Sequence, residues 1–104
     1  MGAYEFQTNV SHKGGATVVA LCGELDVASS PGLSDELAGI IEAGTTDLVI
    51  DLAKLAFIDS TGLSAILRAT SKLEKGHLVL REPNPMVRQV LEITGLTRTV
   101  RIEP

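Results

Sequence analysis

The chain has 104 residues, of which 44% are hydrophobic and 21% charged, and its net charge is −4. That length fits one domain, and the composition supports a packed core rather than a disordered chain. The negative charge disfavours nucleic-acid binding, which requires a clustered basic face. No apolar run reaches the roughly 18 residues of a membrane helix, and no secretory signal precedes the first strand. We therefore expect one cytoplasmic domain over residues 1–104, with no membrane partner.

The first segment predicts a hairpin of two strands. Strands are expected over residues 4–10 and 17–23, with the stretch HKGG as part of the turn between them. The second strand holds Cys22 within the apolar run VVALCG, so we expect this thiol to lie in the core. A single cysteine also excludes an internal disulfide.

The rest of the chain alternates apolar runs with amphipathic stretches, which is typical of strands alternating with helices. Ser30 before Pro31 and Asn84 before Pro85 are helix-start signals, which predict Ser30 and Asn84 as N-caps and each proline as the first helical residue. The expected elements are a helix from Ser30 to Gly44, a strand over 47–52 extended towards Ile58, a helix up to Gly76, a strand over 77–82, a helix up to Gly95 and a last strand around Val100 and Ile102. Helical crossovers make neighbouring strands parallel. We therefore predict an α/β fold: a mostly parallel sheet of about five strands with an N-terminal hairpin and helices after strands 2, 3 and 4.

Polar loops follow the carboxyl ends of three of these strands. The loops are ELDVASS, DST and EPNP, and parallel strands bring such loops to one edge of the sheet. In open α/β sheets that edge is where ligands and partners bind. Function is therefore sought among Asp26, Asp59, Ser60, Thr61 and Asn84.

The stretch FIDSTGLSAIL, residues 57–67, places three polar residues and a glycine between a strand and a helix. In the simplest interpretation they cap the helix: Asp59 or Ser60 accepts hydrogen bonds from its first free N–H groups, which contributes about 1 kcal/mol. A second interpretation makes Ser60 a phosphate acceptor, because an added charge of roughly −1.5 to −2 is best tolerated at a helix N-terminus. Free N–H groups, including that of Gly62, would hold the phosphate oxygens while Asp59 repels them. The fold would stay intact and only the local charge would change.

A hydrolase built on Ser60 is the third interpretation. The nucleophile elbow G-x-S-x-G is incomplete, because Ile58 stands two residues before Ser60. No base is in reach: His77 follows the expected helix, about 22 Å from Ser60 at about 1.5 Å per residue, and His12 lies at the opposite edge. One cysteine and two distant histidines form no metal site, and no nucleotide-binding loop is present. We expect neither an enzyme nor a cofactor.

Three stretches resemble the bacterial anti-sigma factor antagonists of the STAS domain class. They are GELD (residues 23–26), LVIDLAKLAFIDSTGLSAIL (48–67) and VRQVLEITGLTRTVRI (87–102). The resemblance implies a regulatory module that binds an anti-sigma factor with serine kinase activity and so frees the sigma factor for transcription. It implies that the kinase phosphorylates Ser60, with Thr61 ranked behind it, and that the partners then separate. A serine phosphatase of the PP2C type would restore the active form.

By position, the resemblance assigns Asp26 to a contact with the partner. We group with it other positions of the same edge as candidate partner contacts: Asp59, Ser60, Thr61, Gly62 and Asn84. The predicted arrangement is that DST caps the helix and that the cap residue, Ser60, is also the switch.

The chain departs from the family in two places. It stops at Pro104, directly after the last expected strand, where the family usually carries a further helix, and Ser64 stands where glycine is frequent. The first difference indicates a segment of a longer chain or a naturally short member. It keeps an alternative open: a STAS domain that is never phosphorylated and serves as an interaction subunit of a transport complex or larger signalling assembly. The serine at position 60 favours the switch.

Overall fold

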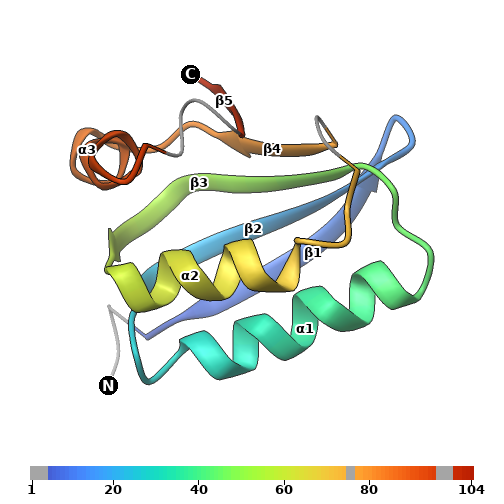
Figure 1. The fold of residues 1–104 in the computed structure, drawn as a ribbon, viewed down its shortest axis with the longest axis horizontal. Coiled ribbons are helices and arrows are strands. Elements are labelled where there is room, and N and C mark those ends of the chain that lie inside the picture. The colour runs from blue at the N-terminus through green and yellow to red at the C-terminus, as the bar shows by residue number, and fades with distance from the viewer. Residues whose placement is uncertain (1–4, 75–76, 96–99) are drawn as a thin grey trace.

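The computed structural model describes residues 5–74, 77–95 and 100–104. These residues form a five-stranded sheet in the order β1-β2-β3-β4-β5, with three helices in the connections (Figure 1). The elements are β1 (Gln7–Lys13), β2 (Ala16–Leu25), α1 (Ser30–Glu42), β3 (Leu48–Ile58), α2 (Ser60–Ala69), β4 (Leu78–Arg81), α3 (Pro85–Ile93) and β5 (Arg101–Glu103).

The sheet is mixed, with one antiparallel hairpin. β1 and β2 pair antiparallel, whereas β2, β3, β4 and β5 pair parallel to their neighbours. The hairpin turn consists of Gly14 and Gly15, whose φ angles are 60° and 85°. A two-residue hairpin turn requires such positive φ angles, and glycine adopts them without steric cost. The predicted fold is confirmed, including helices after β2, β3 and β4.

The strand boundaries differ from the prediction in the hairpin and in the centre of the sheet. β1 begins at Gln7 rather than at residue 4 and continues to Lys13, because the turn at the two glycines lets Lys13 pair with Ala16. β2 runs on to Leu25. β3 is one strand of 11 residues instead of a strand followed by an extended segment.

α2 is shorter than predicted. It ends at Ala69, whereas the predicted end, Gly76, lies outside the described residues. Where the helix stops, the backbone N–H and the hydroxyl of Thr70 both donate hydrogen bonds to the carbonyl of Ile66, at 3.0 Å and 2.7 Å.

Leucine and isoleucine build most of the core, in keeping with the scarcity of aromatic residues. α1 and α2 lie side by side, run in the same direction and cover one face of the sheet (Figure 1). The largest fully buried side chains are Leu21, Leu25, Leu33, Leu37, Leu48, Ile50, Leu52, Leu55, Ile58, Ile66, Leu80 and Leu91. This core holds the carboxyl ends of β2 and β3 in place at the edge where α1 and α2 begin.

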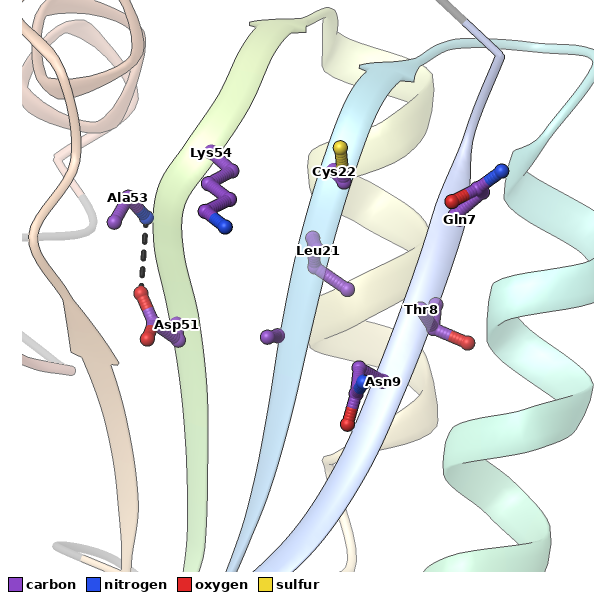
Figure 2. Close-up of a pocket in the computed structure, with 9 residues that line it drawn as sticks. Gln7, Thr8, Asn9, Leu21, Cys22, Asp51, Ala53 and Lys54 are labelled. Atoms are coloured by element: carbon purple, nitrogen blue, oxygen red, sulfur yellow. Dashed lines mark hydrogen bonds between the residues drawn. The ribbon is translucent and has the colours of Figure 1, made fainter.

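The opposite face of β1, β2 and β3 is open and carries small and polar side chains. Figure 2 shows Cys22 and Lys54 among the residues that line a hollow on this face, with the two helices behind the sheet. The predicted core position of Cys22 is therefore wrong: its neighbour Leu21 points into the core, and the thiol is partly exposed on the open side. Successive residues of a strand point to opposite faces, so only one of the two enters a core on one side of the sheet.

α3 packs beside β3 through its buried Val87 and Leu91. In the view of Figure 1 it lies on the other side of β3 from α2. Within the described part of the chain, no helix combines the length and the apolar character needed to cross a membrane.

Candidate partner-binding edge

The connection from β3 to α2 is a side-chain cap. Asp59 has an extended backbone, with φ −113° and ψ −179°, and one oxygen of its carboxylate accepts a 2.8 Å hydrogen bond from the N–H of Gly62. Asp59 is therefore the N-cap, and the prediction that Ser60 caps the helix is wrong. Ser60 is the first helical residue, and its side chain is exposed. The carboxylate of Asp59 therefore caps the helix, and the hydroxyl of Ser60 is left exposed.

Gly62 brings this cap against the end of β2. A Cβ atom added at Gly62 would lie 2.7 Å from Cγ and 2.8 Å from the carbonyl oxygen of Leu25, closer than packed atoms approach. The N–H of Asp59 also donates a 3.3 Å hydrogen bond to the same carbonyl. Gly62 is buried, and its N–H is already donated to Asp59, so its predicted part in holding phosphate oxygens is not supported. The glycine acts as a close-packing residue that fixes the start of α2 on β2.

The loop that follows Leu25 is organised by Asp26. Oδ1 of its carboxylate accepts hydrogen bonds from the N–H groups of Ala28 at 3.0 Å and Ser29 at 3.2 Å, and from the Ser29 hydroxyl at 3.2 Å. These bonds, the one from the Ser29 N–H first, hold the pKa of Asp26 below its usual value. Ser30 is not the cap of α1 as predicted: Ser29 takes that position, and the Ser30 hydroxyl donates to the Asp26 carbonyl. One oxygen of Asp26 thus shapes the loop, and none of these bonds uses its other oxygen.

Asn84 caps α3, as predicted, and is fully engaged in doing so. Its Oδ1 accepts a 2.7 Å hydrogen bond from the N–H of Val87, and its Nδ2 donates a 3.0 Å bond to the carbonyl of Leu55 on β3. Asn84 shares the sheet edge with Asp26 and Asp59, but its amide turns into the fold. Its predicted role as a partner contact stays a prediction.

Exposed apolar side chains stand next to these polar residues, and the sequence analysis missed them. Val27, directly after Asp26, is 70% exposed, and Phe57 and Met86 are 37% and 39% exposed. Such side chains are what a protein partner buries, whereas a small polar ligand does not need them. The sequence offered one indication of this exposure: Val27 lies in a polar loop and does not belong to the apolar pattern of a helix or strand.

Glu82 was also missed, in the connection between β4 and α3. Its φ of 57° lies in the left-handed region, although it is not glycine and precedes Pro83. Its N–H donates a 2.8 Å hydrogen bond to the carbonyl of Glu103 on β5. The residue type does not predict this conformation, since residues other than glycine rarely adopt a positive φ.

The described residues contain no group of three potential metal ligands. His77 lies 2.9 Å from the carboxylate of Asp47, and Nδ1 of His12 lies 3.3 Å from the hydroxyl of Thr17. Both histidines belong to strand ends remote from Ser60, as the sequence predicts. The edge therefore offers a capped helix start, exposed hydroxyls and exposed apolar groups, an arrangement suited to contact with another protein.

Comparison with known proteins agrees with this description. Residues 7–104 match the model of the STAS domain. BtrV of Bordetella bronchiseptica is 37% identical over 83 residues, which cover 78% of this chain and 72% of BtrV. The anti-sigma-B factor antagonist of Bacillus subtilis is 34% identical over 86 residues, covering 81% of this chain and 78% of that protein. None of these relatives is named as an enzyme.

Solved structures of antagonists have the same fold. An anti-sigma factor antagonist from Mycobacterium paratuberculosis superposes with a TM-score of 0.89 at 28% identity, covering 99% of this chain and 89% of that one. The antagonist SpoIIAA in its unphosphorylated form gives 0.78 at 27% identity, covering 94% and 87%. Bacillus SpoIIAA in its phosphorylated form gives 0.69 at 26% identity, covering 94% and 90%. The chain belongs to the STAS domain family, and within that family to the anti-sigma factor antagonists.

Proposed function

We propose that this antagonist binds an anti-sigma factor serine kinase while Ser60 is unmodified, and that phosphorylation of Ser60 switches the binding off. One observation carries the proposal. Ser60 is exposed at the first position of α2, its hydroxyl makes no hydrogen bond to the other described residues, and the Asp59 cap that starts the helix does not depend on it. The group that is modified is thus separate from the group that holds the fold.

No basic side chain of α2 stands close to Ser60 to pair with a phosphate. Asp59 is its neighbour in the chain, and the N–H of Gly62 is already bonded to that carboxylate. The first cation along α2 is Arg68, eight residues or about 12 Å further along the helix axis. The phosphate would therefore meet a bound partner as an unpaired charge, at a cost of about 2–5 kcal/mol, or some 30- to several-thousand-fold in affinity.

The relatives support this cycle. SpoIIAA has been solved in unphosphorylated and phosphorylated forms, and both share the fold of this chain. We propose the corresponding partners here: an anti-sigma factor with serine kinase activity, which adds the phosphate, and a PP2C-type serine phosphatase, which removes it. Binding would involve Asp26, Thr61 and the exposed Val27 as neighbours of Ser60.

Intact-mass spectrometry tests the modification. The chain is incubated with ATP and an anti-sigma factor kinase from the same genome, alongside Ser60→Ala and Thr61→Ala variants. We expect one added phosphate in the unmodified chain and in Thr61→Ala, and none in Ser60→Ala. A phosphate that persists in Ser60→Ala would place the acceptor elsewhere. If the kinase binds the chain but adds no phosphate, the chain is an interaction module without a phosphorylation switch, and the proposal is wrong.

A further inference from the structure

A groove runs along the seam between α1 and α2 and opens at the edge that carries Ser60. Two adjoining hollows form it, and both are lined by Ser34 of α1 and Arg68 of α2. We define the α1–α2 groove by the residues that bear on its chemistry: Asp35 and Glu42 from α1, and Thr61, Ala65, Arg68 and Lys72 from α2 and the turn after it. Because Thr61 follows Ser60 directly and Val27 lines the same end, the groove continues the proposed partner-binding edge.

The two walls of the groove carry opposite charges. Arg68 and Lys72 stand on the α2 side, four residues apart, while Asp35 and Glu42 stand on the α1 side. All four are exposed, and none forms an ion pair with another described residue. Charges that served only to hold the helices together would pair across the seam. These remain available, and the basic wall is a local exception in a chain of net charge −4.

Small side chains, together with Ile41, make up most of the uncharged lining of the groove. Ala38 of α1 and Ala65 and Ala69 of α2 lie between the charged walls. Small residues between two helices let a third backbone approach closely, which is how one helix packs into the groove of a pair.

We propose that the α1–α2 groove receives one α-helix of the anti-sigma factor, with acidic side chains facing Arg68 and Lys72. Two cations four residues apart in the chain, both exposed and without an ion-pair partner among the described residues, favour a helix that brings more than one carboxylate to this wall. The inference rests on the proposed function, since it names where the same partner docks. The edge around Ser60 acts as the switch, and the groove supplies area and orientation.

Charge reversal in the groove tests this docking mode. The affinity of the unphosphorylated chain for its anti-sigma factor is measured by calorimetry without ATP, and compared with that of the Arg68→Glu/Lys72→Glu double variant. The matched control is Lys13→Glu/Lys54→Glu, which changes the net charge equally at exposed sites outside the groove. We expect the groove variant to bind at least about tenfold more weakly, with the loss shrinking at high salt, and the control to bind within about twofold of the original chain.

A measurement on the unaltered chain guards against misfolding of the variant. Amide NMR shifts of the isotope-labelled chain are followed as the anti-sigma factor is added, and we expect changes at Ala38, Ala65 and Ala69. If the original chain binds, the groove variant binds equally well and these amides do not shift, the docking inference is overturned while the proposed function stands. If the original chain binds no anti-sigma factor, the proposed function fails and this inference with it.

Discussion

α2 and α3 begin at the same edge of the sheet with the same kind of cap, but they differ in the residues that follow the cap and in how the helix start is packed. In both, the N-cap side chain accepts a hydrogen bond from the N–H three residues later: Asp59 from Gly62 at 2.8 Å, and Asn84 from Val87 at 2.7 Å. At the next position α3 has Pro85, which has no hydroxyl, whereas α2 has Ser60.

The third helical position separates the two starts further. In α3 it is Val87, whose side chain is buried in the core. In α2 it is Gly62, which has no side chain because Leu25 of β2 occupies the space. The start of α3 is therefore fixed by the buried side chain of Val87, whereas the start of α2 packs closely on β2 because Gly62 has no side chain. The two helix starts therefore share a cap and differ in two features that only α2 has: the exposed Ser60 hydroxyl, where we propose the switch, and the close contact of Gly62 with Leu25.

The largest effect is expected where this close contact is broken. Gly62→Ala places a Cβ atom 2.7–2.8 Å from Leu25, including its backbone carbonyl, which cannot move without shifting β2. Overpacking of this kind costs about 1–3 kcal/mol. Urea denaturation should show this loss in the free energy of unfolding.

Gly39→Ala in α1 is the matched control, because nothing lies within 4 Å of the added atom. There the better helix propensity of alanine should stabilise the chain by about 0.5–1 kcal/mol. Equal changes at positions 62 and 39 would contradict the close-packing role of Gly62.

The two caps themselves should differ in strength. Asn84→Ala removes the bond from Val87 and also leaves the Leu55 carbonyl without its donor, so we expect a loss of about 1–2 kcal/mol. Asp59→Ala removes one capping bond and should cost about 1 kcal/mol. Urea denaturation of both variants gives their unfolding free energies. A larger loss for Asp59→Ala than for Asn84→Ala would contradict this expectation.

Ser60→Ala should leave stability nearly unchanged, within about 0.5 kcal/mol, because the cap belongs to Asp59 and the hydroxyl is exposed. Thermal unfolding followed by circular dichroism measures this. A marked destabilisation would mean that the hydroxyl helps to hold the helix, and the separation of fold from switch would be wrong.

The smallest effect concerns pH. The folded-state pKa of Asp26 is lowered by the Ser29 and Ala28 hydrogen bonds, so its charged form stabilises the fold above its usual pKa of about 4. That contribution is lost as the pH falls through the lower folded-state value. The difference in unfolding free energy between the original chain and Asp26→Ala should therefore shrink below about pH 4, whereas the difference for the neutral Asn84→Ala should change little. The same pH dependence for both variants would contradict a stabilising role of the hydrogen bonds to the Asp26 carboxylate.

Much of this edge could be predicted from the sequence, because strand alternation and the Asn-Pro signal act locally. The order of strands and helices and the α3 cap follow from such signals. Which of Asp59 and Ser60 caps α2 could not be predicted, since both residue types cap helices and the backbone angles decide. The contact of Gly62 with Leu25 joins residues distant in sequence, and the outward position of Cys22 depends on which sheet face the helices cover. These depend on tertiary packing rather than on residue type.

We propose that a phosphate on Ser60 weakens the binding of the anti-sigma factor without altering the fold. The most direct test is calorimetric titration of the purified anti-sigma factor with the chain in its unmodified and Ser60-phosphorylated forms, with both forms checked by circular dichroism. We expect indistinguishable spectra for the two forms and a Kd raised at least about 30-fold by the phosphate. Equal affinities for the two forms would contradict it.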